Sequence, residues 1–128
     1  MKLLLDTCAF LWFQADSPSL SPVAKSAILD PANEVFLSAV SAWEIARKYA
    51  QGGLQLPAHP STLIPAIRNQ SGIASLPLTE ADALAAEKLQ LFHKDPFDRM
   101  LIAQALMGGL AILTSDRAFE PYPVRVIW

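Results

Sequence analysis

Two acidic residues each come at the end of a short apolar run. Asp6 directly follows the leucines at 3–5, and Asp116 follows the run that begins at Leu110. Asp is common in turns and at helix N-termini, so loop chemistry explains either residue alone. Two acids at two equivalent positions favour a functional site over chance turn residues. In an open parallel sheet, the reactive groups lie just beyond the carboxyl ends of the strands.

A third acid, Glu44, lies between Trp43 and Ile45 in a segment with helical spacing. One interpretation is a surface pair with Lys48 four residues later, which would contribute only about 0.2–0.5 kcal/mol. The predicted helix also starts at the carboxyl end of a predicted strand. Glu44 is therefore within reach of the same sheet edge as Asp6.

Two further acids lie in the segment HKDPFDR at residues 93–99. Asp95 precedes Pro96, which is typical of a helix N-cap followed by proline at the first helical position. We interpret Asp95 mainly as this cap. Asp98 falls at the third helical position, where the helix dipole favours an acid. We interpret Asp98 as a site residue, because this helix start points towards the same edge as Asp6.

Carboxylates that converge on one point need a cation. The four candidates are Asp6, Glu44, Asp98 and Asp116. Two unit charges about 4 Å apart repel by roughly 4 kcal/mol at an effective dielectric of about 20, and a divalent cation removes this penalty. Oxygen ligands favour Mg²⁺ or Mn²⁺ over zinc. The two histidines, His59 and His93, have no second histidine at metal-ligand spacing, so we expect both to be surface or loop residues.

Short apolar segments alternate with segments of helical spacing along the chain. The predicted strands are 2–5, 34–38, 73–78, 110–114 and 124–128, and the predicted helices are 9–14, 22–29, 41–51, 63–70, 79–93 and 96–107. Prolines are expected to break the segment 57–65. This alternation predicts an α/β fold, a short parallel sheet of four to five strands with helices on both faces.

The composition indicates one domain, spanning residues 1–128. The chain is 52% hydrophobic and 17% charged, which is more apolar than a small monomer needs, so some of the excess is expected at a protein interface. A net charge of −2 indicates no basic patch for nucleic acid.

The single cysteine, Cys8, excludes an intramolecular disulfide and fits a reducing cytoplasm. No apolar run approaches the roughly 18 residues of a membrane span, and the N-terminal segment lacks the pattern of a signal peptide. We therefore expect a cytoplasmic protein with no membrane partner.

Four segments together resemble PIN-domain ribonucleases, and more closely the VapC-type toxins of bacterial toxin–antitoxin pairs. They are LLLDTCAFLW, SAVSAWEIARKYAQGGL, HKDPFDRMLIAQAL and LAILTSDRAF, in order between Met1 and Trp128. The resemblance implies an endoribonuclease that uses Mg²⁺ or Mn²⁺ to hydrolyse RNA. It also implies a cognate antitoxin as partner, and a homodimer or a toxin–antitoxin hetero-oligomer.

By this resemblance the four candidate acids match the acidic quartet of the family. Thr114, in LTSD, matches a position that supports the site, whereas Asp95 is an extra acid that many relatives lack. We expect Asp6 and Asp98 to bind the metal directly. We expect Glu44 and Asp116 to bind it through water, to hold a second ion or to steer the attacking water.

The sequence allows two roles for the basic residues near the acids, and two roles for the apolar ones. Arg47, Lys48, Arg99 and Arg117 could face the phosphate, or could form only a solvated rim. The apolar residues 10–13 are divided between core packing and a groove for an antitoxin helix or a second copy.

Three alternatives are weighed against the nuclease. A haloacid-dehalogenase-type phosphatase needs a second Asp two residues after the first, and Cys8 stands there. A receiver domain needs paired acids after the first strand and a late lysine, and no lysine follows Met100. A non-catalytic interaction module with the same fold is the third alternative, and the complete set of acids disfavours it.

Overall fold

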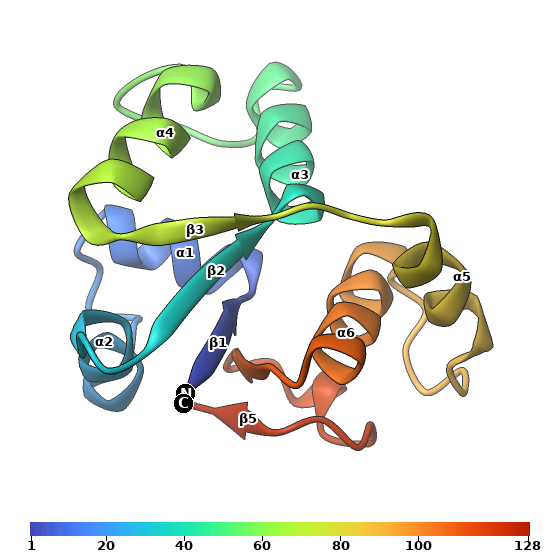
Figure 1. Ribbon diagram of the computed structural model, residues 1–128. Coiled ribbons are helices and arrows are strands. Elements are labelled where there is room, and N and C mark those ends of the chain that lie inside the picture. Colours follow the sequence, from blue (N-terminus) through green and yellow to red (C-terminus); the bar gives the residue numbers. More distant parts are fainter.

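The computed structural model describes residues 1–128 and contains one five-stranded parallel sheet in the order β3-β2-β1-β4-β5 (Figure 1). The strands are β1 (Lys2–Leu5), β2 (Glu34–Ser38), β3 (Ile73–Leu76), β4 (Ala111–Leu113) and β5 (Val126–Ile127). Strands β2 and β3 lie on one side of β1, and β4 and β5 lie on the other side. The strand order therefore reverses between β1 and β4, which is the position where open α/β sheets bind their ligands.

Helices cover both faces of the sheet, as the alternating pattern predicted (Figure 1). They are α1 (Thr7–Gln14), α2 (Pro22–Leu29), α3 (Ala39–Ala50), α4 (Pro60–Ser71), α5 (Glu80–Lys88) and α6 (Pro96–Gly108), followed by a short 3₁₀ turn, η1 (Arg117–Phe119). Successive side chains of a strand point to opposite faces, so Leu3 and Leu5 pack under α1 and α2 while Leu4 packs under α6.

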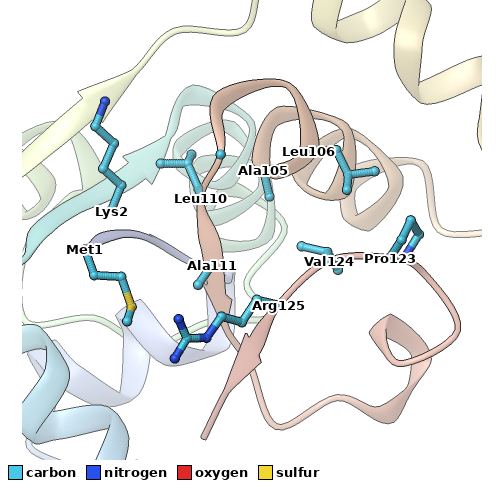
Figure 2. Close-up of a pocket in the computed structure, with 10 residues that line it drawn as sticks. Met1, Lys2, Ala105, Leu106, Leu110, Ala111, Pro123, Val124 and Arg125 are labelled. Carbon is cyan, nitrogen blue, oxygen red and sulfur yellow. The ribbon is translucent and has the colours of Figure 1, made fainter.

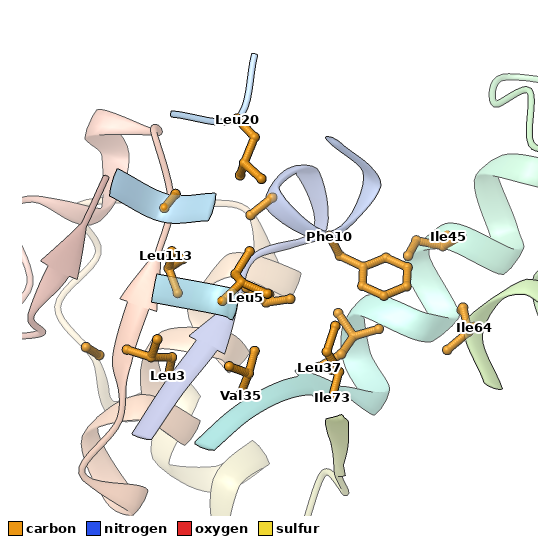
Figure 3. Close-up of a cluster of buried hydrophobic side chains, with 14 residues drawn as sticks. Leu3, Leu5, Phe10, Leu20, Val35, Leu37, Ile45, Ile64, Ile73 and Leu113 are labelled. Carbon is orange, nitrogen blue, oxygen red and sulfur yellow. The ribbon is translucent and has the colours of Figure 1, made fainter. Parts of the chain in front are cut away.

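The larger core lies between the sheet and α1, α2, α3 and α4 (Figure 3). Phe10 of α1 is completely buried there beside Leu5 and Ile45. The other two aromatic residues of α1, Trp12 and Phe13, are partly buried and pack against the same cluster. The predicted division of residues 10–13 is thus resolved largely in favour of core packing.

Several helix boundaries differ from the predicted ones. α1 begins at Thr7 and α3 at Ala39, each two residues early, because Asp6 and Ser38 accept hydrogen bonds from the first turn of the following helix. α4 begins at Pro60 rather than at 63, since proline is well suited to the first helical position.

The end of α5 shows the largest difference. The helix ends at Lys88, whereas the sequence predicted a helix up to 93. Carbonyl groups of Ala86 and Leu89 accept hydrogen bonds from the guanidinium of Arg99 instead of continuing the helix. No helix in the structure has both the length and the apolar character required to span a membrane.

Candidate active site

A pocket of about 200 Å³ lies where the chain leaves β1 and β4. Its lining residues are Asp6, Thr7, Cys8, Trp12, Glu44, Lys48, Asp95, Asp98, Ser115 and Asp116. The structure therefore brings all four candidate acids, and the additional Asp95, to one cavity. Lys48 is the single basic residue in this lining, so the pocket carries a strong excess of negative charge.

Asp6 is held at this edge by the pairing of β1 with β4. Leu5 pairs with Leu113, which places Thr114 next to Asp6. The Thr114 hydroxyl donates to Asp6 Oδ2 at 2.5 Å, and Ala9 N donates to Asp6 Oδ1 at 2.7 Å. Thr114 Oγ1 also accepts from the backbone N–H of Asp116 at 3.0 Å, so one hydroxyl connects the two acids.

Asp6 is only 7% exposed, and no basic side chain pairs with its carboxyl group. Burial raises the pKa of Asp6, and the charges of Asp116 and Glu44 raise it further. The hydrogen bonds from Thr114 and Ala9 lower this pKa and only partly oppose the burial. A buried acid beside other acids is the environment that a bound cation would stabilise.

Glu44 satisfies both interpretations of its sequence position. It forms the i,i+4 ion pair with Lys48, with Nζ 3.2 Å from Oε2. Yet Glu44 is buried rather than on the surface, and its Oε1 accepts a 2.6 Å hydrogen bond from the hydroxyl of Thr7. The contact between Thr7 on α1 and Glu44 on α3 fixes this carboxylate at the pocket.

Asp95 caps α6 as predicted. Its Oδ1 accepts hydrogen bonds from Phe97 N at 2.8 Å and from Asp98 N at 3.2 Å.

Burial raises the pKa of Asp98 to about 6, and the neighbouring carboxylates of Asp95 and Glu44 raise it as well. A hydrogen bond from His93 lowers the pKa of Asp98, but the effect of burial is larger.

His93 is a loop residue, as predicted, but it contacts one of the four candidate acids, which the sequence analysis did not anticipate. The His93 side chain is 22% exposed, and its Nε2 lies 2.8 Å from Asp98 Oδ2. The spacing of the histidines did not indicate this contact, because the partner of His93 is a carboxylate and not a second histidine. The signal was present in the sequence: His93 lies five residues before Asp98, in the loop that leads into α6.

Arg99 is buried and bound to backbone carbonyl groups, so neither of its two suggested roles, facing the phosphate or forming a solvated rim, was correct. Its guanidinium donates to the carbonyl oxygens of Ala86, Leu89, Gln90 and His93. These bonds hold the segment between α5 and α6 against the start of α6.

The other basic candidates are divided between the pocket and its surroundings. The Arg47 guanidinium lies 5.5 Å from the ring centroid of Trp43 and 5.4 Å from that of Phe97. The Arg117 side chain is 92% exposed and lies 4.0 Å from Glu120, as expected of a solvated rim. Lys48 is the one of the four that lines the pocket.

The donor set fits a divalent cation that prefers oxygen. Five carboxylates share the pocket with one lysine, and at least Asp6 and Glu44 are almost fully withdrawn from water. Cys8 also lines the pocket, but burial and the charge of Asp6 raise the pKa of its thiol, so it is protonated near neutral pH. A protonated thiol is a poor nucleophile and a poor metal ligand, which leaves the carboxylates as the reactive groups.

A second cavity, of about 300 Å³, lies at the opposite edge of the sheet (Figure 2). Met1, Lys2, Leu106 and Arg125 are among its lining residues, and no carboxylate side chain faces it. It lacks the ligands for a cation and is separate from the acidic pocket.

Comparison with known proteins identifies the family of the chain. The family model of the PIN domain matches residues 3–124. The chain is 30% identical over 129 residues to Ribonuclease VapC22 of Mycobacterium tuberculosis (strain ATCC 25618 / H37Rv), covering 97% of each protein.

Solved structures share the fold. VapBC2 from Rickettsia felis, bound to a promoter DNA fragment, matches with a TM-score of 0.72 at 11% identity, covering 98% of this chain and 97% of that one. A toxin-antitoxin complex from Klebsiella pneumoniae matches with a TM-score of 0.63 at 20% identity, covering 94% and 92%. With the family match and the 30% identical relative, the chain belongs to the PIN domain family, among its VapC-type members.

Proposed function

We propose that this protein is a metal-dependent endoribonuclease that acts as the toxin of a toxin–antitoxin pair. The observation that carries the proposal is the pocket at the strand-order reversal, where Asp6, Glu44, Asp98 and Asp116 meet with a single lysine. The relative named as a ribonuclease supports RNA as the substrate. The toxin-antitoxin complex with the same fold supports an antitoxin partner.

Asp6 and Asp98 would hold Mg²⁺ or Mn²⁺ directly, while Glu44 and Asp116 would bind through water or orient the attacking water. When bound, the cation supplies a Lewis acid that lowers the pKa of water and offsets charge on the phosphoryl oxygens. Thr114 fixes the orientation of Asp6 by its hydrogen bond, and Thr7 does the same for Glu44. Carboxylates oriented in this way lose little freedom when the cation binds.

Lys48 is the residue best placed to bind the substrate phosphate. Its ammonium lies at the pocket and is paired with Glu44, while its side chain is still 45% exposed. A phosphodiester that enters a pocket with five acids meets repulsion, and Lys48 offsets part of it. This explains how a chain with a net charge of −2 could bind RNA without a basic patch.

The partners would include the antitoxin and a second copy of the chain. A wholly apolar depression of about 240 Å³ is lined by Ala39, Val40, Trp43, Leu78, Phe97 and Met100. It lies on α3 and α6, the helices that also supply Glu44 and Asp98. The apolar excess of the composition therefore does reach the surface, as an interface requires. We further propose that residues 1–128 form one catalytic domain that acts in the cytoplasm.

Incubation of the purified protein with mixed RNA tests this function. We expect cleavage with Mg²⁺ or Mn²⁺, loss of cleavage with EDTA, and recovery when excess metal is added. Asp16→Asn is the matched control, because Asp16 is an exposed acid paired with Lys25 outside the pocket. Failure of every metal to support cleavage would favour the non-catalytic interaction module, and cleavage unaffected by EDTA would contradict a metal-dependent mechanism.

A further inference from the structure

We propose that His93 is a nitrogen ligand of the bound cation, and that it makes the site favour Mn²⁺ over Mg²⁺. This inference rests on the proposed metal-dependent function and adds a residue outside the four acids. It assigns a chemical role to the only histidine that contacts one of those acids.

The arrangement of ligand atoms supports this role. One ligand atom from each of His93, Asp98 and Asp116 lies within 4.8 Å of the other two. Atoms that bind one cation at about 2.0–2.2 Å lie at most roughly 4.4 Å apart, so small side-chain adjustments would let His93 and Asp98 contact it directly, with Asp116 close enough to bind it through water. The three residues come from different elements: Asp98 from α6, Asp116 from the loop after β4, and His93 from the α5–α6 loop.

The backbone of His93 is fixed more firmly than that of an ordinary loop residue. Its N–H donates to the hydroxyl of Tyr122 at 3.0 Å, and its carbonyl accepts from Arg99 at 3.3 Å. The Tyr122 hydroxyl in turn donates to the carbonyl of Gln90 at 2.8 Å. A buried tyrosine and a buried arginine therefore fix the backbone of His93, and its imidazole lies against Asp98 before any cation binds.

The chemistry of imidazole explains the metal preference. Mg²⁺ is bound almost entirely through oxygen, whereas nitrogen ligands suit transition metals and raise the affinity for Mn²⁺ relative to Mg²⁺. In the metal-free protein, Nε2 is hydrogen-bonded to Asp98. Binding would replace that hydrogen bond, and the neutral imidazole with its proton on Nδ1 would present the Nε2 lone pair to the cation. The alternative is that His93 keeps this hydrogen bond, only orients Asp98 and does not touch the cation.

Pulsed EPR of Mn²⁺ bound to the full-length protein separates the two arrangements. We expect a directly bound ¹⁴N coupling in the wild type and its loss in His93→Gln, which retains hydrogen-bonding capacity. His59→Ala is the matched control, because His59 caps α4 through Ser61 and forms no hydrogen bond with any of the candidate acids. Circular dichroism of each variant verifies that the protein is folded before the spectra are compared.

Calorimetric titration with Mn²⁺ and with Mg²⁺ provides the second measurement. We expect the ratio of the two affinities to fall on the order of tenfold in His93→Gln and to stay unchanged in His59→Ala. Bound Mn²⁺ without ¹⁴N coupling in the wild type, or an unchanged ratio in His93→Gln, would overturn the role of His93 and leave the proposed nuclease intact. No binding of either cation would overturn both proposals, and binding of Mg²⁺ without Mn²⁺ would overturn only the role of His93.

Discussion

Asp6 serves the fold and the pocket with the same carboxyl group. One oxygen caps α1 through Ala9 N, and the other accepts from Thr114. These two hydrogen bonds require acceptors but not a full negative charge. The charge itself is unfavourable in this buried position, as the raised pKa of Asp6 shows.

Asp6→Asn should therefore separate stability from activity. Asn is as good an N-cap as Asp: its Oδ1 can accept from Ala9 N, and its Nδ2 can donate to the Thr114 hydroxyl, which then accepts in place of donating. We expect the thermal unfolding temperature of the metal-free protein to be equal or higher, and RNA cleavage to fall at least about a hundredfold because the charge that holds the cation is gone. Melting curves and cleavage rates in Mg²⁺ test this. Cleavage at the wild-type rate would refute the assignment of Asp6.

The two acids of the α6 start should respond differently to removal. Asp95→Ala removes an N-cap that accepts two backbone N–H groups, so we expect it to lower the free energy of unfolding by about 0.5–2 kcal/mol. Asp98→Ala should instead abolish cleavage. Urea denaturation and cleavage assays on both variants check the pair. The opposite pattern would mean that Asp95, which also lines the pocket, is the essential acid.

The pKa of Asp98 predicts how the metal-free protein responds to pH. Its pKa of about 6 in the folded state exceeds the ordinary value of 3.8, so the folded protein binds more protons than the unfolded chain between these values. The resulting stabilisation is fully present below pH 3.8 and is lost as the pH rises through about 6. Its size is on the order of 2–3 kcal/mol. Asp6, whose pKa is also raised, acts in the same direction.

Chemical denaturation in EDTA at several pH values between 4 and 7 measures this effect. Asp98→Asn should flatten the decline, because amides do not titrate. Asp16→Asn should leave the decline in place, since the pKa of the exposed Asp16 is lowered by Lys25 rather than raised. A wild-type stability that rises across this pH range would contradict the assignment.

The segment between α5 and α6 has little secondary structure, yet it is held in place by one side chain. Arg99 lies in the first turn of α6 and donates to four carbonyl groups, from Ala86 to His93. Tyr122, which follows η1, also binds this segment: its hydroxyl accepts from His93 N and donates to the carbonyl of Gln90. This loop carries His93 and ends at Asp95, so its conformation decides which side chains reach the pocket.

Arg99→Met should be strongly destabilising. It keeps much of the side-chain volume but leaves several carbonyl groups without a donor, and we expect a loss of about 3 kcal/mol or more in the free energy of unfolding. Arg117→Met is the control, because Arg117 is 92% exposed and should change stability by less than about 0.5 kcal/mol. Urea denaturation compares the two. Similar losses would show that the buried hydrogen bonds of Arg99 contribute little.

At the scale of the whole molecule, α3 and α6 contribute both to the acidic pocket and to an apolar surface. The acids weaken the metal-free fold near neutral pH, and a cation that binds only the folded state would restore it. The like-charge repulsion expected from the sequence does raise the pKa values of Asp6 and Asp98, but burial is the larger cause for both.

Millimolar Mn²⁺ at pH 7 should therefore raise the unfolding temperature. A cation at about one hundred times its dissociation constant stabilises the folded state by about 2.7 kcal/mol. The effect should vanish in the variant that combines Asp6→Asn, Glu44→Gln, Asp98→Asn and Asp116→Asn. Differential scanning calorimetry with EDTA or Mn²⁺ tests this. An unfolding temperature that does not respond to Mn²⁺ would remove the metal from the proposed mechanism.

The sequence by itself determined the strands, the fold class and the set of four acids that share the pocket. Each of these depends on local information: a continuous apolar run forms a buried strand, and an acid directly after it must lie at the carboxyl edge. The parallel arrangement then brings Asp6 and Asp116 together, because all strands end at the same edge. The same local logic identified the cap at Asp95.

Only the tertiary structure decided the roles of Arg99 and His93. Both residues lie in the polar segment HKDPFDR, and their partners are set by how the chain folds back between α5 and α6. Whether a guanidinium reaches solvent or buried carbonyl groups depends on side-chain direction and on contacts with Tyr122, which lies 23 residues beyond Arg99 in the sequence. Local periodicity carries no information about such contacts, because they form only when distant segments pack together.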